Sequence, residues 1–159
     1  MIRPAAPADV PVLVELIVEL AEFEKARDRV EIDTAALERA LFGQEPSAFA
    51  RVAVDADLVV GMALYYRSFS TWTGRPGIYL EDLYVRPSHR GTGFGKALLG
   101  ALARLALEEG CARLEWSVLD WNEPAIAFYR SIGAVATDEW TRYRLDGPAL
   151  AEFSLAASN

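Results

Sequence analysis

The sequence predicts an α+β domain built on a mixed β-sheet, with a central twisted sheet flanked by helices. Three observations support this fold class. Apolar residues up to Gly43 recur at three- and four-residue steps, which is typical of amphipathic helices. Two short apolar segments then flank Asp55-Ala56-Asp57, the pattern of an antiparallel hairpin. From Gly77 to Gly133, strand-like and helix-like segments alternate. No repeat or linker interrupts the chain, so residues 1–159 are expected to form a single domain.

The first part of the chain is expected to hold one strand and two helices. Met1–Pro4 is a short strand, and Asp9 precedes a helical pattern that runs to about Glu24. Asp33 is expected to cap the N-terminus of a second helix, which ends at Gly43.

The middle of the chain is expected to form three strands. They are predicted over Phe49–Val54, Leu58–Tyr66 and Gly77–Val85, and a polar loop over Ser68–Gly77 separates the last two.

The remaining elements are two helices and further strands. A long helix is predicted from near Phe94 to Gly110, and a second opens at Asn122-Glu123-Pro124, where Asn caps the helix and Pro is tolerated in the first turn. Strands are predicted over Cys111–Leu119, Ala134–Thr137 and Trp140–Leu145, before a short tail.

Composition excludes several classes of protein. The chain is 52% apolar and 25% charged, as in a globular enzyme rather than a disordered protein. A net charge of −7 argues against binding to nucleic acid or to an anionic membrane. Cys111 is the only cysteine, and the start of the sequence has no leader pattern, so a reducing, cytoplasmic location is expected. One histidine and one distant cysteine predict no metal site.

The most distinctive stretch is Arg90-Gly91-Thr92-Gly93-Phe94-Gly95-Lys96, between a predicted strand and a predicted helix. Glycines permit a tight turn and close approach of a ligand to the backbone, and a helix N-terminus attracts phosphate. A Walker loop would need Ser or Thr where Ala97 stands, and a dinucleotide fold usually carries its glycines near the N-terminus. We therefore expect a phosphate cradle of another kind; the alternative is a glycine-rich turn with no ligand.

Two acids, Glu81 and Asp82, interrupt the apolar strand before this loop. Adjacent strand residues point to opposite faces, so at least one carboxylate is expected to face the interior or a cleft. An unpaired buried carboxylate costs roughly several kcal/mol, which calls for a partner or a function. The pair predicts a general base or a cation anchor; the alternative is a solvated pair at a β-bulge.

Tyr129 lies on the helix that Asn122 is expected to cap. A phenol that faces a cleft can protonate a leaving group. The alternative is an aromatic side chain in the core beneath an amphipathic helix.

Together these segments resemble the GNAT N-acetyltransferase superfamily, whose phosphate-binding motif Arg/Gln-x-x-Gly-x-Gly/Ala is matched by Arg90-x-x-Gly93-x-Gly95. The runs Tyr79–Val85 (YLEDLYV) and Trp121–Tyr129 (WNEPAIAFY) are similar to the diamine (spermidine/spermine) and thialysine N-acetyltransferase group, as is Leu20–Glu24. The resemblance covers almost the whole chain. It implies the GNAT-like acyl-CoA N-acyltransferase fold and transfer of an acetyl group from acetyl-CoA to a primary amine of a small cationic metabolite.

The resemblance also implies roles for individual residues. The co-substrate acetyl-CoA is held through its pyrophosphate by the loop and through its pantetheine arm by the preceding strand and the later helix: Leu83, Tyr84, Val85, Arg90, Gly91, Thr92, Gly93, Phe94, Gly95, Lys96, Asn122 and Tyr129. Glu81 accepts a proton from the substrate ammonium, and Tyr129 protonates the departing thiolate. The amine pocket contains Phe23, Glu24, Glu81 and Asp138. A homodimer whose active sites use both subunits is expected.

Two departures from the group bear on the substrate. The group's first-helix Tyr-Glu is Phe23-Glu24 here, which removes a phenol from the pocket, and the segment after Gly133, which contains Asp138, is shorter. Two other functions stay open. Acetylation of a protein N-terminus or lysine would need an open peptide groove, and a non-catalytic acyl-CoA-binding module would bind acetyl-CoA without transferring it.

Overall fold

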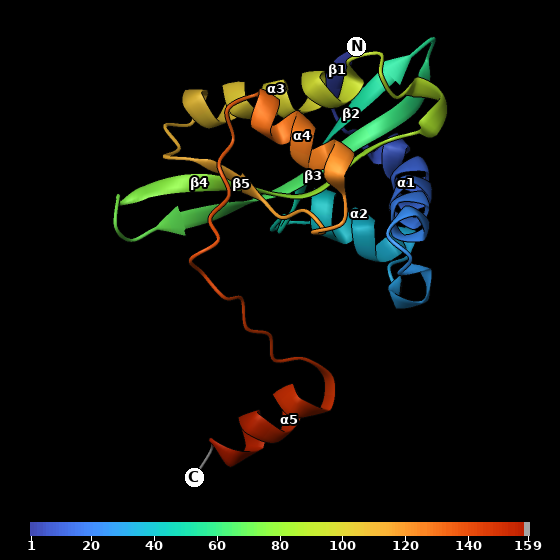
Figure 1. The fold of residues 1–159 in the computed structure, drawn as a ribbon. Helices are drawn as coiled ribbons and strands as arrows, with labels where there is room; N and C mark the ends of the chain where they lie inside the picture. Colours follow the sequence, from blue (N-terminus) through green and yellow to red (C-terminus); the bar gives the residue numbers. More distant parts are fainter. Residues whose placement is uncertain (158–159) are drawn as a thin grey trace. The chain divides into compact units, whose positions relative to one another are not determined.

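The computed structural model describes residues 1–157, which divide into two compact units. The first unit comprises Met1–Ser117, and the second begins at Val118. The elements of both are labelled in Figure 1. No helix in the described part of the chain is long and apolar enough to cross a membrane.

The first unit is built on a five-stranded mixed sheet with the order β1-β2-β3-β4-β5. Every neighbouring pair is antiparallel except β4 and β5, which are parallel, so the predicted mixed sheet is confirmed. The strands are β1 (Ile2–Pro4), β2 (Phe49–Asp55), β3 (Leu58–Ser70), β4 (Arg75–Val85) and β5 (Leu114–Trp116).

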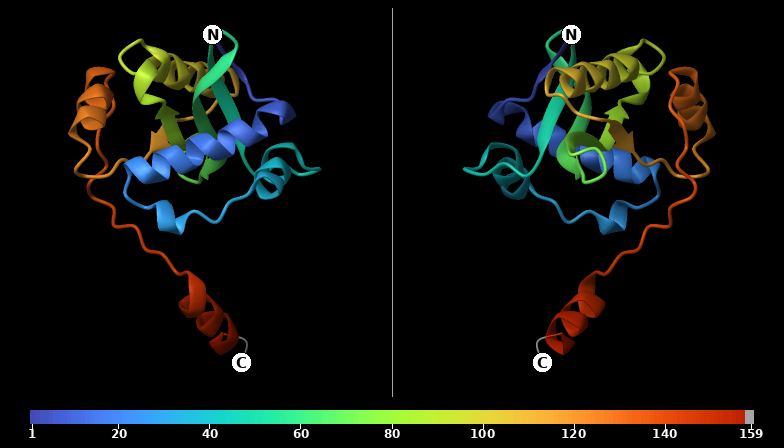
Figure 2. Two further views of the ribbon diagram at one scale, coloured as in Figure 1. Left: turned by 90° about the vertical axis from the view of Figure 1, so that its right-hand side faces the viewer. Right: turned by 90° about the vertical axis from the view of Figure 1, so that its left-hand side faces the viewer.

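Helices cover both faces of this sheet (Figure 2). They are α1 (Val10–Phe23), α2 (Thr34–Phe42) and α3 (Phe94–Glu108), with short 3₁₀ turns at Pro7–Asp9, Arg27–Arg29 and Pro87–His89. Val52, Met62 and Tyr84 form one core with apolar residues of α1 and α2. Because side chains alternate along a strand, their buried neighbours Ala53 and Ala63 lie on the opposite face, which α3 covers.

Two boundary predictions for this unit were wrong in extent. β3 and β4 pair as far as Ser70 and Arg75, so the predicted loop over Ser68–Gly77 shrinks to a tight turn at Thr71–Gly74. A continuous antiparallel ladder outweighs the polar composition of these residues. The predicted strand over Cys111–Leu119 is reduced to Leu114–Trp116, which is the part that pairs with β4, although Cys111 is buried as expected.

The second unit holds α4 (Glu123–Ser131) and α5 (Gly147–Ala156). Asn122 caps α4 as predicted, and its side chain accepts the N–H of Ala125 at 3.4 Å. The final strand pair is wrong: Ala134–Thr137 and Trp140–Leu145 form no strand in the described chain, and the tail forms a helix. A strand forms only where a neighbouring strand takes its backbone hydrogen bonds, and in the described residues the sheet consists of β1 to β5 without these segments.

A partly buried ion pair joins β1 to the turn that precedes α1. The Asp9 carboxylate accepts hydrogen bonds from both terminal nitrogens of Arg3, at 2.6 and 2.9 Å, and from the Ala6 N–H at 2.7 Å. These bonds, that from Arg3 above all, hold the pKa of Asp9 below its usual value. The stability they supply is present above the ordinary pKa and is lost as the pH falls through the lowered one.

Asp9→Ala should therefore destabilise the protein by about 1–3 kcal/mol at pH 7, because Arg3 is partly exposed while Asp9 is buried. Urea unfolding should show the gap between variant and wild type narrowing as the pH falls toward 3. Glu22→Gln, which breaks the exposed 3.6 Å pair with Arg27, is the control and should change stability by less than about 0.5 kcal/mol. Equal effects of the two substitutions at pH 7 would contradict the prediction.

Candidate active site

One edge of β4 lacks a strand partner just before the glycine loop. β3 pairs with β4 up to Val85, whereas β5 pairs only with Ile78–Leu80. Within residues 1–157, no strand pairs with the second edge of β4 from Glu81 onward. Peptide N–H and C=O groups along such an edge can bond to a ligand that carries amides. The predicted contact segment Leu83–Val85 lies in this part of β4.

The glycine loop leads from this strand to the N-terminus of α3. Gly91 and Gly93 have φ of 76° and 93°, a region that side chains with a Cβ rarely adopt, and Gly93 is the N-cap of α3. The N–H of Ala97 bonds to the Gly93 carbonyl at 2.9 Å, so the preceding three amides of α3 have no partner within the helix. Unbonded amides and the positive end of a helix dipole favour binding of an anion, which is the kind of ligand that the sequence predicts for this loop.

A bulge in β4 decides how the two acidic residues are placed. Leu64 lies opposite Asp82 while its neighbour Tyr65 lies opposite Leu80, so Glu81 is the extra residue in the ladder. Asp82 then shares the face of Tyr84, toward α1, and is half-buried, whereas Glu81 is exposed. The family resemblance gave a role to Glu81 and none to Asp82, and the residues alone did not show which acid would be buried, because the position of a bulge depends on strand pairing.

Two acidic residues at this end of the sheet contribute to a raised pKa of the Asp82 carboxyl group. Burial, followed by the charges of Glu81 and then Glu24, raises the pKa of Asp82 to about 6. Desolvation also raises the pKa of Glu24, which directly follows α1. No basic group is among the causes of the raised pKa of Asp82. Asp82, Glu81 and Glu24 therefore form a negative region that a cation would stabilise.

Arg90 and Phe23 meet at the same end of α1. The Arg90 guanidinium lies 4.9 Å from the centre of the Phe23 ring and 5.4 Å from that of Tyr84, and its Nε donates to the Val85 carbonyl at 2.9 Å. The first unit thus brings the glycine loop, the open edge of β4 and the predicted pocket residues Phe23 and Glu24 to one end of the sheet.

The second unit carries the other predicted residues. Asn122 caps α4, and Tyr129 lies about two turns further along this helix. Tyr129 is half-buried, and its ring centre is 5.5 Å from that of Phe128. Asp138 is exposed in the irregular segment after α4. Among residues 1–157, no group of three or more His, Cys, Asp or Glu is placed to hold a metal ion.

Several known proteins are similar to this chain in sequence. The acetyltransferase (GNAT) family matches residues 13–134. A thialysine N-epsilon-acetyltransferase from Bos taurus is 41% identical, covering 97% of this chain and 96% of the relative. A spermidine/spermine N(1)-acetyltransferase-like protein 1 from Homo sapiens is 33% identical over 96% of this chain, but over only 23% of its own length.

A solved structure is also similar to this chain over nearly its whole length. An integron cassette protein from the mobile metagenome of V. cholerae superposes with a TM-score of 0.81 at 29% identity, covering 97% of this chain and 96% of the other. The match to the family over most of the chain, with full-length similarity to a thialysine acetyltransferase, shows that this protein belongs to the GNAT acetyltransferase family.

Proposed function

We propose that this N-acetyltransferase transfers the acetyl group of acetyl-CoA to a primary amine of a small di- or polycationic metabolite, of the thialysine or polyamine class. The observation that carries the proposal is the cluster of Glu24, Glu81 and Asp82 at the end of the sheet where the glycine loop begins. Relatives named for thialysine and for spermidine/spermine support the same substrate class.

Two features of the first unit suit two parts of acetyl-CoA, the pyrophosphate and the pantetheine arm. The pyrophosphate fits the unbonded amides of Phe94, Gly95 and Lys96 at the start of α3. The pantetheine arm, which carries two amides, fits the open edge of β4 over Leu83–Val85. Backbone donors on that edge would also stabilise the oxyanion that develops on the thioester carbonyl.

The reaction joins the amine nitrogen to the thioester carbon and breaks the carbon–sulfur bond. An alkylammonium has a pKa near 10.4, so it must lose a proton before it attacks. In our proposal Glu81, exposed at the bulge, accepts that proton, and Asp82 and Glu24 hold the positive charge of the substrate. Tyr129 of α4 supplies the proton that the thiolate takes as it leaves.

Free-thiol release from acetyl-CoA, measured with thialysine, polyamines, lysine and short peptides, tests the proposal. We expect free-thiol release, corrected for a blank without amine, to be fastest with a small amine that carries a second positive charge. Faster turnover of peptides would favour a protein acetyltransferase. If the protein bound acetyl-CoA but released no free thiol from it with any amine, only the non-catalytic binding module would remain.

The loop glycines give a second test, because they act in different ways. Gly93→Ala places a Cβ at a φ of 93°, which strains the loop by roughly 1–2 kcal/mol and should weaken acetyl-CoA binding by about 10-fold. Gly95 has ordinary helical φ, and a Cβ there would lie 4.0 Å from Val85, so Gly95→Ala should weaken binding without destabilising the free protein. Calorimetric titration with acetyl-CoA and thermal melts measure both effects.

Gly100→Ala on α3 is the matched control for both loop variants. A Cβ there meets only the end of Arg104 at 3.8 Å, so this variant should bind acetyl-CoA like wild type and melt at the same or a higher temperature. If Gly93→Ala and Gly100→Ala bound acetyl-CoA equally well, the loop would not be the pyrophosphate site.

We also propose that the protein is a homodimer. The second unit exposes large apolar side chains, among them Val135 (84% exposed), Trp140 (68%) and Tyr143 (95%). Large apolar side chains that are exposed so near one another in the sequence favour a surface that a partner covers. Light scattering that gave a mass near the 17.5 kDa of one chain at all concentrations would contradict a dimer.

A further inference from the structure

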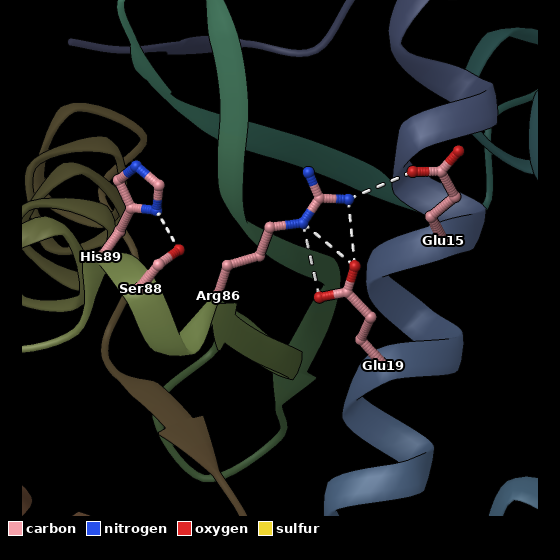
Figure 3. Close-up of polar contacts among 5 residues, drawn as sticks. All are labelled: Glu15, Glu19, Arg86, Ser88 and His89. Carbon is pink, nitrogen blue, oxygen red and sulfur yellow. Dashed lines mark hydrogen bonds and ion pairs between the residues drawn. The ribbon is translucent and has the colours of Figure 1, made fainter.

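A charged side chain ties the start of the glycine loop to the middle of α1. Arg86 directly follows β4, and its guanidinium spans the space to two glutamates of α1 (Figure 3). One terminal nitrogen lies 3.1 Å from Glu15 Oε2 and 3.0 Å from Glu19 Oε1, and Nε donates to Glu19 Oε1 at 3.0 Å. Arg86 is separated from these glutamates by 71 and 67 positions in the sequence.

This contact is better fixed than an ordinary surface ion pair. Glu15 and Glu19 are one helical turn apart, so both face the same guanidinium. The side chains of Arg86 and Glu19 are only 29% and 32% exposed, and the Arg86 N–H bonds to the Val60 carbonyl at 2.9 Å. Backbone and side chain are thus both held, and a bidentate arginine fixes direction as well as distance.

A second arginine attaches the other end of the same turn to α1. Arg90 follows the Pro87–His89 turn and contacts Phe23, the last residue of α1, through its ring. Arg86 and Arg90 therefore hold the turn at two heights on one helix. The glycines that follow have no side chains to restrain them, so these arginines set where the loop begins relative to α1.

The end of α1 is where the proposed amine site lies. Glu24, just after α1, contributes to the raised pKa of Asp82, so the two carboxyl groups are close enough to interact. A displacement of α1 along its axis would move Glu24 relative to the loop and to the open edge of β4. Misplacement of reacting groups by about 1 Å can slow a reaction on the order of 100-fold.

We propose that Arg86 is a positioning residue for acetyl transfer, which, through Glu15 and Glu19, holds the amine-binding end of α1 in register with the acetyl-CoA loop. This role rests on the proposed function. Arg86 need not touch either substrate, so its removal should alter the alignment of the two substrates more than the affinity for acetyl-CoA.

Arg86→Gln tests the role by separating kinetic constants. We expect kcat/KM for the amine to fall about 10-fold, with less than about a 2-fold change in the Kd of acetyl-CoA. The Glu15→Gln/Glu19→Gln double variant should reproduce this loss, and adding Arg86→Gln to it should cause little further loss, because the three residues act as one unit. Arg86→Lys should recover part of the activity.

Arg67→Gln is the matched control. Arg67 also makes a two-point ion pair, at 2.6 and 3.0 Å to Glu109, but joins β3 to the end of α3 instead of the loop to α1. It should lower the melting temperature comparably while leaving kcat/KM within about 2-fold well below that temperature. A similar kinetic loss in Arg67→Gln, or unchanged kcat/KM in Arg86→Gln, would make Arg86 merely structural. If Arg86→Gln raised only the Kd of acetyl-CoA, and by a large factor, Arg86 would instead be a residue that binds acetyl-CoA.

Hydrogen exchange separates this inference from the proposed function. Arg86→Gln should speed amide exchange in the last two turns of α1, and Arg67→Gln should not. If wild type releases no thiol with any amine, the proposed function fails whatever the exchange shows. If wild type is active but α1 exchanges at the same rate in both variants, the positioning role of Arg86 is overturned.

Discussion

Replacing Asp82 with asparagine should stabilise the protein at pH 8 and slow its reaction with a cationic amine at the same pH. The pKa of Asp82 is raised from 3.8 to about 6, so the folded protein binds this proton more tightly than the unfolded chain does. That contribution to stability is complete below pH 3.8 and is lost as the pH rises through about 6. At pH 8 the ionised carboxylate therefore destabilises the fold.

The size of this effect follows from the two pKa values. Their difference corresponds to about 3 kcal/mol at most, and a half-buried amide also needs hydrogen bonds, so we expect Asp82→Asn to gain about 1–2 kcal/mol at pH 8. The gain should vanish toward pH 4. Urea unfolding at the two pH values measures it, and Asp28→Asn, at an exposed position, should show no such gain.

The same substitution removes a charge from the proposed amine site. Loss of one charged hydrogen bond corresponds to about a 10- to 100-fold fall in kcat/KM. In wild type, kcat/KM for the amine should fall as the pH drops through about 6, and Asp82→Asn should lose that limb of the profile. A variant that is more stable yet fully active would remove Asp82 from the amine site.

Local chemistry made much of this fold predictable from the sequence. Asp33 caps α2 through a 2.7 Å bond from the Ala36 N–H, and Asn122 caps α4, because capping depends on residues three positions apart. The hairpin around Ala56 and the end of α3 before Gly110 also follow from short-range patterns. The glycine loop was located in the same way, since a positive φ favours glycine whatever surrounds it.

The features that escaped prediction depend on residues distant in sequence. A β-bulge was one alternative for Glu81 and Asp82, but which of the two acids it exposes is set by the register of β3 against β4, which no residue near Glu81 encodes. The contact of Arg86 with Glu19 joins elements that only the fold brings together. Strand-like patterns at Trp140–Leu145 were misleading for the same reason, because a strand needs a partner edge as well as suitable residues.

Replacing Tyr129 with phenylalanine should lower kcat by about 10-fold or more while leaving the affinity for acetyl-CoA largely intact. The substitution removes only the phenol oxygen, so the packing of the ring near Phe128 on α4 should be kept. In the proposed reaction, the thiolate of CoA must then leave without a proton from the enzyme. A thiolate is a tolerable leaving group, which is why we expect a partial loss of turnover.

The pH profile distinguishes a proton donor from a residue that only packs. If Tyr129 donates a proton, the wild-type kcat should fall at high pH as the donor ionises, and Tyr129→Phe should lose this dependence. Phe128→Leu is the control on the same helix: it alters the packing against Tyr129 and should keep the high-pH limb. An acetyl donor with a more acidic thiol should restore turnover in Tyr129→Phe more than in wild type, because its leaving group needs the proton less. Unchanged turnover of Tyr129→Phe with acetyl-CoA would remove Tyr129 from the mechanism.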